Sequence, residues 1–140
     1  MKRVLVVDDD DEIRQIISAA LKMQGYDAID VSNGDEAVRQ MSMQSFDLVV
    51  CDLFMPDKDG METMLAIRKT QPLIPIILIT GGGRLFWAGG GGLEDLLESA
   101  ELLGVTLCMM KPFRPSQLIS FVKRALSTMS GDAGSLTPGA

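Results

Sequence analysis

The sequence predicts an α/β fold of the doubly wound kind, in which helices cover both faces of a parallel sheet. Five short apolar runs recur along the chain, and a stretch with the apolar spacing of a helix follows each of them. Strands and helices that alternate in this way form parallel sheets with right-handed crossovers. At 140 residues, the chain is also long enough to bury one substantial core.

The five apolar runs are the predicted strands. The first is continuous and rich in β-branched residues, as expected of a strand that is buried on both faces. The second mixes polar and apolar residues, so we expect it at an edge of the sheet. The runs span residues 4–7, 26–31, 46–51, 75–79 and 105–110.

Apolar residues three and four positions apart predict the five helices. We expect Gly25, Pro72 and Gly104 to end the first, third and fourth of them. Asn33, with Glu36 three residues later, is expected to cap the second. The apolar stripes are Ile13, Ile16, Ile17, Ala20 and Leu21; Ala37, Val38 and Met41; Met61, Met64, Leu65 and Ile67; Leu93, Leu96, Leu97, Ala100 and Leu103; Leu118, Phe121, Val122, Ala125 and Leu126.

Composition argues against several classes of function. The 13 basic and 19 acidic side chains give a net charge of −6, which disfavours direct nucleic-acid binding by this chain. The absence of histidine excludes histidine-based catalysis and histidine metal sites. No run approaches the roughly 20 apolar residues of a membrane span, and the start is too short in apolar residues for a signal peptide. We therefore expect a cytoplasmic protein that does not bind membranes.

Acidic residues, a hydroxyl and a lysine follow or end the predicted strands. Asp8 and Asp9 follow the first, Asp52 the third, Thr80 the fourth and Lys111 the fifth. The carboxyl ends of parallel strands share one edge of the sheet, where ligands bind. Carboxylates at this density suit a hard cation such as Mg²⁺, and a lysine suits a phosphoryl oxygen. The pattern predicts phosphoryl transfer with an aspartate as nucleophile.

Three segments, VLVVDDD, DLFMPDKDG and KPF, occur in this order and spacing at residues 4–10, 52–60 and 111–113. Over about residues 2–128 the chain resembles the response regulator receiver family of two-component signalling. The resemblance implies a flavodoxin-like (βα)5 fold whose five-stranded parallel sheet has the order 2-1-3-4-5. We expect a receiver domain over residues 1–128 and a disordered tail over residues 129–140.

The resemblance also implies a role for each matching residue. Asp52 would accept a phosphoryl group from a sensor histidine kinase or a histidine phosphotransfer protein. Asp9 would bind Mg²⁺ directly and Asp8 would act beside it, often through water. With Asp52 and the main-chain carbonyl of Phe54, these residues would form the metal site. Thr80 would be the switch hydroxyl.

Lys111 would pair with the phosphoryl group, and the Lys111–Pro112 bond is expected to be cis. The protein is then a stand-alone, phosphorylation-controlled binding module, which is not an enzyme beyond self-phosphorylation and slow autodephosphorylation. A downstream protein partner would dock around the predicted fourth helix, fifth strand and last helix. A homodimer on phosphorylation is an alternative output.

The sequence departs from the family pattern in three places. Cys108 stands where the family commonly has an aromatic residue that moves on activation. Phe54 and Gly82 offer no polar side chain to guide water to an acyl phosphate, which predicts slow self-hydrolysis. Residues 81–92 form a glycine-rich insertion without the lysine of a nucleotide-binding loop. It is either a passive connection or an apolar anchor that uses Phe86 and Trp87.

Two other functions fit part of the pattern. A small phosphohydrolase of the haloacid dehalogenase type would use Asp8 as its nucleophile, but it leaves the Asp52 motif unexplained. A flavodoxin-like protein that binds FMN would purify as a yellow protein.

Overall fold

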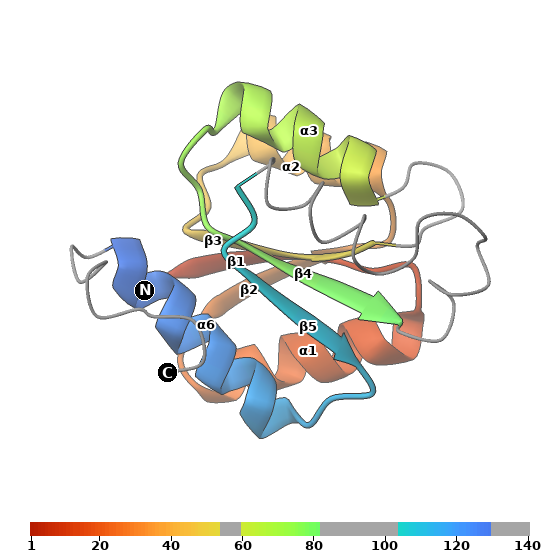
Figure 1. Cartoon of the computed structure of the whole chain (residues 1–140), viewed down its shortest axis with the longest axis vertical. Helices are drawn as coiled ribbons and strands as arrows, with labels where there is room; N and C mark the ends of the chain where they lie inside the picture. Colours follow the sequence, from red (N-terminus) through yellow and green to blue (C-terminus); the bar gives the residue numbers. More distant parts are fainter. Residues whose placement is uncertain (54–59, 82–103, 130–140) are drawn as a thin grey trace.

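The computed structural model describes residues 1–53, 60–81 and 104–129 of the chain (Figure 1). Its five strands form one parallel sheet in the order β2-β1-β3-β4-β5, which confirms the predicted fold class. The predicted fourth helix, most of the glycine-rich insertion and the tail from residue 130 lie outside the described residues. The strands are β1 (Arg3–Val7), β2 (Asp27–Val31), β3 (Leu48–Asp52), β4 (Ile76–Gly81) and β5 (Leu107–Lys111); the helices are α1 (Asp11–Met23), α2 (Gly34–Met43), α3 (Gly60–Thr70) and α6 (Pro115–Met129).

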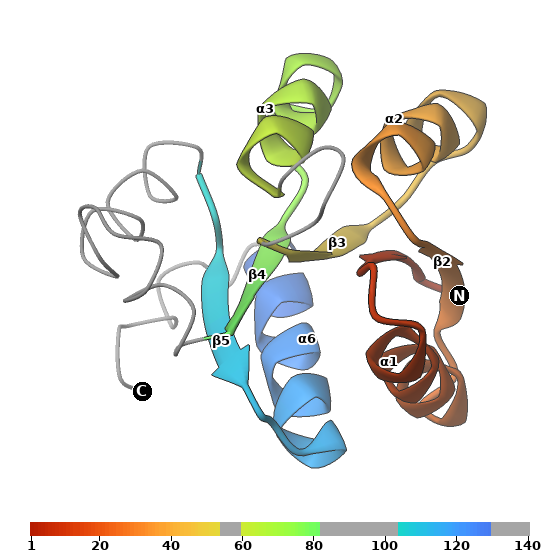
Figure 2. The same cartoon turned by 90° about the vertical axis from the view of Figure 1, so that its right-hand side faces the viewer.

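The helices form a layer on each face of the sheet, with α1 and α6 on one face and α2 and α3 on the other (Figures 1 and 2). Each layer buries its own hydrophobic cluster against the strands. Side chains alternate along a strand, so Leu48 and Val50 of β3 belong to the α1/α6 cluster, whereas Val49 and Cys51 belong to the α2/α3 cluster. This alternation decides which way the residues at the strand ends point.

Side-chain caps begin helices α1 and α2, and a glycine follows α1. The Asp10 side chain accepts hydrogen bonds from the amides of Glu12 and Ile13 and caps α1. The Asn33 side chain accepts one from the Glu36 amide at 2.9 Å and caps α2, as predicted. Gly25 follows α1 with a φ of 88°, a left-handed conformation that explains why glycine ends this helix.

Several boundaries and burials differ from the prediction. β3 begins at Leu48, because residue 46 does not enter the ladder, and it includes Asp52, which pairs with Ile79. β5 covers Leu107–Lys111 rather than residues 105–110. Ile16 was expected on the buried stripe of α1 but is 45% exposed, because the stripe centres on Ile17 and Leu21.

Leu65 was likewise expected on the buried stripe of α3 but is 48% exposed. Cys51 is buried, whereas Cys108 is half-buried because β5 is an edge strand. Both thiols are free. Among the described residues, no helix is long and apolar enough to cross a membrane.

Candidate functional site

Four of the predicted site residues lie at one edge of the sheet. Asp8 directly follows β1, Asp52 ends β3 and Lys111 ends β5, while Thr80 is the next-to-last residue of β4. Because β1, β3, β4 and β5 are consecutive neighbours in a parallel sheet, their carboxyl ends meet there. The Lys111–Pro112 bond is cis, as expected.

Lys111 bridges two buried carboxylates. Its Nζ lies 3.2 Å from Asp8 Oδ2 and 3.3 Å from Asp52 Oδ2. Asp8 is 1% exposed and Asp52 is 3% exposed, whereas Asp9 is exposed at the mouth of the site. One oxygen from each of Asp8, Asp9 and Asp52 lies within 4.8 Å of the others. Among the described residues, the Lys111 ammonium group therefore pairs with two of three clustered carboxylates.

Burial and the neighbouring charges shift the pKa values of Asp8 and Lys111. Burial raises the pKa of Asp8 above its usual value, and hydrogen bonding by the Asp10 amide and the charge of Lys111 only partly oppose this. Burial would lower the pKa of Lys111, but the charges of Asp52 and Asp8 outweigh it, and that pKa is raised. The lysine therefore stays protonated, and one more cation would relieve the remaining repulsion.

The carboxylates fit a magnesium ion. Asp8 Oδ1 accepts a hydrogen bond from the Asp10 amide at 2.9 Å, but the buried Oδ2 has no hydrogen bond and faces the cluster. Its approach to Lys111 Nζ is an ion pair without hydrogen-bond geometry. A buried carboxylate oxygen in this state is suited to a hard cation with oxygen ligands. The predicted main-chain ligand, Phe54, lies outside the described residues.

Thr80 is placed differently from the other site residues. It is 1% exposed, and its Oγ1 has no hydrogen-bond partner. Along β4 it shares the α2/α3 face with Leu78, whereas Asp52 follows Val50 toward the α1/α6 face. The structure thus brings Asp8, Asp9, Asp52 and Lys111 together, and it leaves the Thr80 hydroxyl buried and unbonded beside them.

Two residues that support the site were missed by sequence reasoning. The Gly60 amide donates to the Leu53 carbonyl at 2.7 Å, and a Cβ at Gly60 would lie 2.6 Å from Leu53 Cα and closer still to the Asp52 carbonyl. The sequence analysis used Gly60 only as the last residue of the segment at residues 52–60. Arg14 donates from Nη1 to the Asp8 carbonyl at 2.9 Å. An arginine within an amphipathic helix gives no sequence signal for this contact.

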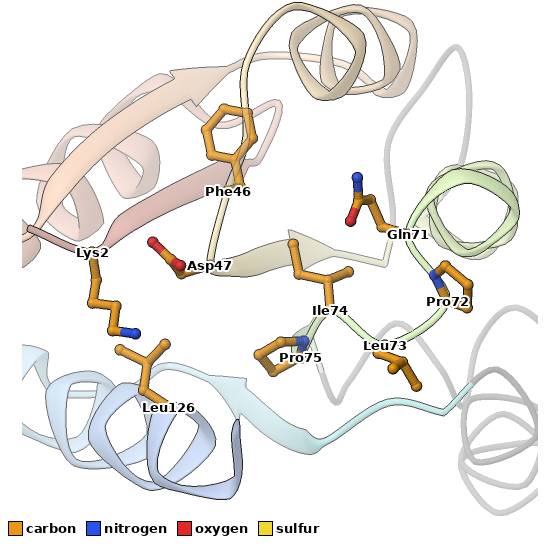
Figure 3. A pocket seen from close by; sticks show the side chains of 9 residues that line it. All are labelled: Lys2, Phe46, Asp47, Gln71, Pro72, Leu73, Ile74, Pro75 and Leu126. Atoms are coloured by element: carbon orange, nitrogen blue, oxygen red, sulfur yellow. The ribbon is translucent and has the colours of Figure 1, made fainter. Parts of the chain in front are cut away.

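A cavity of about 410 Å³ lies away from this cluster, between the start of β3, the segment before β4 and the end of α6 (Figure 3). Among the described residues that line it, Lys2 and Asp47 are the charged ones, and Asp47 already accepts a hydrogen bond from the Arg3 amide at 2.8 Å. Because the other lining residues are mostly apolar, we place the chemistry at the acidic edge. The remaining lining residues are Phe46, Gln71, Pro72, Leu73, Ile74, Pro75 and Leu126.

Comparison with known proteins agrees with this geometry. The model of the response regulator receiver domain family matches residues 4–123. The chain is 31% identical to the transcriptional regulatory protein CpxR homolog of Haemophilus influenzae, over 98% of this chain and 56% of that protein. It is 33% identical to the alkaline phosphatase synthesis transcriptional regulatory protein PhoP of Bacillus subtilis, over 89% of this chain and 48% of that protein. The chain thus spans about half the length of these curated relatives.

Solved structures with the same fold match the chain over most of its length. The chemotaxis protein CheY4 of Vibrio cholerae is 28% identical with a TM-score of 0.79, covering 89% of this chain and 98% of that one. A CheY-like receiver domain protein from Methanospirillum hungatei is 26% identical with a TM-score of 0.82, covering 94% and 98%. With its 2-1-3-4-5 sheet and its acidic edge, the chain belongs to the response regulator receiver domain family of two-component systems.

Proposed function

We propose that Asp52 accepts a phosphoryl group from a sensor histidine kinase or a histidine phosphotransfer protein, and that this modification changes binding to a protein partner. Membership of the receiver family supports a phosphorylation-controlled signalling switch. The observation that carries the assignment is the position of Lys111 Nζ, 3.3 Å from Asp52 Oδ2 and 3.2 Å from Asp8 Oδ2. An ammonium group at these distances supports the proposal, because the proposed nucleophile and the transferred phosphoryl group are both anionic.

The transfer is a substitution at phosphorus. A carboxylate oxygen of Asp52 attacks the phosphorus of a phosphohistidine, a P–O bond forms, and the P–N bond breaks. The imidazole leaves with the bonding electron pair and takes up a proton. Lys111, which holds the Asp52 carboxylate before transfer, can then pair with a phosphoryl oxygen.

Negative charge is the main barrier to this reaction. The acceptor and the phosphoryl group are both anionic, and Asp8 and Asp9 add to the repulsion. Bound by Asp8, Asp9, Asp52 and the main-chain carbonyl of Phe54, Mg²⁺ would neutralise this charge and bind phosphoryl oxygens. The unbonded Oδ2 of Asp8 supports this role.

Thr80 would transmit the change. Its Oγ1 has no hydrogen bond to lose, so donating to a phosphoryl oxygen costs no existing interaction. The segment that follows β4 would shift with it. We propose that residues 1–128 form the receiver domain, and that a protein partner or a second copy docks around the predicted fourth helix, β5 and α6. Direct nucleic-acid binding by this chain is not proposed, because its net charge is −6.

Labelling of the full chain tests the proposal. Acetyl phosphate with Mg²⁺ is expected to add one phosphoryl group, detected by intact mass, and beryllofluoride is expected to mimic it. Asp52→Asn and chelation of Mg²⁺ are each expected to abolish labelling. Asp47→Asn, which changes a carboxylate at the opposite edge of the sheet, is the matched control and should label like the wild type.

One outcome would overturn the assignment. If labelling survives in Asp52→Asn but is lost in Asp8→Asn, the nucleophile is Asp8. Sustained turnover of phosphate esters by the same preparation would then identify a phosphohydrolase of the haloacid dehalogenase type.

A further inference from the structure

Arg14 ties the loop after β1 to the neighbouring strand. Its Nη1 donates to the Asp8 carbonyl at 2.9 Å, its Nε to Asp30 Oδ2 at 2.9 Å and its Nη2 to Asp11 Oδ1 at 2.6 Å. The side chain is only 14% exposed. These contacts join the first turn of α1, the end of β1 and β2 through one guanidinium group.

Asp8 is consequently held at three atoms. Its amide donates to the Val31 carbonyl at 3.2 Å, its carbonyl accepts from Arg14, and its Oδ1 accepts from the Asp10 amide at 2.9 Å. Only Oδ2 has no hydrogen bond, and it is the oxygen that faces Lys111 and the acidic cluster. The loop is therefore built to present one oxygen of Asp8.

The hydrogen bond from Arg14 to the Asp8 carbonyl also restrains the backbone at Asp9. The peptide group between Asp8 and Asp9 is planar, so fixing the Asp8 carbonyl also fixes the position of the Asp9 Cα, from which the Asp9 side chain extends. Among the described residues, no hydrogen bond or ion pair holds the Asp9 carboxylate itself. Its position depends on the backbone, and Arg14 holds that backbone.

We propose that Arg14 is a positioning residue for the metal site, which orients Asp8 and Asp9 for Mg²⁺ through the Asp8 carbonyl. The inference rests on the proposed function, because it assumes that these carboxylates bind Mg²⁺. Arginine suits the task because its planar fork donates in three fixed directions, which lysine cannot do. Groups that orient metal ligands commonly change metal affinity by roughly 10–100-fold when they are removed.

Arg14 acts by geometry rather than by charge. Two carboxylates, Asp11 and Asp30, accept from its guanidinium group and offset its positive charge. Its contact with the site is to a backbone carbonyl, not to a carboxylate of the cluster. Removing Arg14 should therefore weaken Mg²⁺ binding even though it removes a positive charge near a cation site.

Calorimetric titration of the full chain with MgCl₂ tests this inference. Arg14→Met is expected to weaken Mg²⁺ binding roughly tenfold. Arg14→Lys, which keeps the charge but not the fork, should resemble Arg14→Met rather than the wild type. Arg39→Met, which changes an exposed arginine on α2, is the matched control and should bind like the wild type.

Asp30→Asn is the milder variant, because it loosens the guanidinium group without touching the cluster. It should weaken binding by a smaller factor than Arg14→Met, and it decides the question if Arg14→Met does not fold. Thermal unfolding in EDTA identifies folded variants. If folded Arg14→Met, or Asp30→Asn in its place, binds Mg²⁺ like the wild type, Arg14 is purely structural and the inference is wrong.

The two proposals fail in distinguishable ways. A wild type that binds no Mg²⁺ would overturn the metal site and the role of Arg14 together. If the wild type binds Mg²⁺ and binding is lost in Asp52→Asn but not in Arg14→Met, the metal site stands and only the positioning role of Arg14 is wrong.

Discussion

The amide of Gly60 donates a 2.7 Å hydrogen bond to the carbonyl of Leu53, the residue directly after Asp52. The start of α3 therefore lies against the backbone that carries the proposed phospho-acceptor. A side chain at Gly60 would meet the Leu53 Cα at 2.6 Å, a backbone atom that cannot move independently of the site.

Gly60→Ala is accordingly expected to destabilise the protein by about 1–3 kcal/mol and to slow labelling of Asp52, because α3 or the end of β3 must shift. Urea unfolding and intact-mass labelling measure the two effects. Gly25→Ala is the matched control: nothing lies within 4 Å of its added Cβ, but its φ of 88° makes alanine cost about 1–2 kcal/mol. It should unfold more easily yet label normally. Normal labelling of Gly60→Ala would refute the proposed link between α3 and the site.

Replacement of Lys111 should destabilise the protein, because Asp8 and Asp52 would then repel each other without a cation between them. In the Mg²⁺-free protein, Lys111→Met is expected to cost roughly 2 kcal/mol of unfolding free energy, between the values for exposed and buried ion pairs. Because the Lys111 pKa is raised, its contribution is complete below the ordinary value of 10.5 and is lost as pH rises through the raised value. Added Mg²⁺ should restore part of the loss. Lys69→Met, on the exposed side of α3, should have little effect in either condition.

Whereas Lys111 is expected to stabilise the Mg²⁺-free protein, the Asp8 carboxylate is expected to destabilise it. Its pKa is raised by burial, so the unfolded chain ionises first as pH rises from the ordinary value of 3.8. The folded protein then carries a carboxylate that it disfavours, and the contribution of Asp8 stays unfavourable at neutral pH. Asp8→Asn should therefore be more stable than the wild type in EDTA at pH 7, with the difference narrowing as pH falls toward 3.8. Lys111 keeps Asp52 as its partner in this variant.

Mg²⁺ should reverse that order, because it stabilises the wild type but not Asp8→Asn. Urea unfolding across a pH series, with EDTA or MgCl₂, measures both comparisons. An Asp8→Asn protein that is less stable than the wild type in EDTA at pH 7 would show that the buried carboxylate is not a cost.

Thr80 carries a buried hydroxyl that bonds to nothing. Thr80→Val should leave the unmodified protein as stable as the wild type or stabilise it by up to about 1 kcal/mol. It should also reduce the rise in unfolding temperature that beryllofluoride and Mg²⁺ produce. Ser18→Ala removes another unbonded buried hydroxyl, on α1 and remote from the strand ends, and should leave that rise unchanged. An undiminished rise in Thr80→Val would remove Thr80 from the switch.

The lifetime of the phosphorylated state tests the sequence-based interpretation of Phe54. With no polar side chain at this position to guide water, self-hydrolysis should be slow. Phe54→Asn is expected to hasten phosphate loss, followed by intact mass after removal of acetyl phosphate. Phe54→Leu, which keeps the side chain apolar, is the control. An unchanged rate in Phe54→Asn would count against shielding by Phe54.

The fold and the acidic edge could be predicted because their signals are local. A buried strand requires an apolar run, and Asp52 or Lys111 is recognisable as the first polar group where such a run ends. Parallel topology then places these ends together without any knowledge of side-chain contacts. The exposure of individual side chains was not predictable. The exposure of Ile16 and Cys108 depends on how far a helix layer or a neighbouring strand covers them.

The supporting contacts could not be predicted for a related reason. The role of Gly60 depends on how closely α3 approaches β3. The role of Arg14 depends on a main-chain carbonyl, a group that every residue has and that the sequence therefore does not mark. Each is a tertiary relationship between a side chain, or its absence, and the backbone of another segment. Sequence spacing records which groups are present, but not which backbone they meet.

The alternation of side chains along the strands has one further consequence. Asp52 and Lys111 follow the α1/α6 side of the sheet, while Thr80 and Cys108 follow the α2/α3 side. The sheet would then act as a partition, with the phosphoryl group arriving on one side and the first structural response beginning on the other. Because the proposed docking surface includes α6, which lies on the side that carries Asp52, the response would have to pass around the end of β4 to reach a partner there.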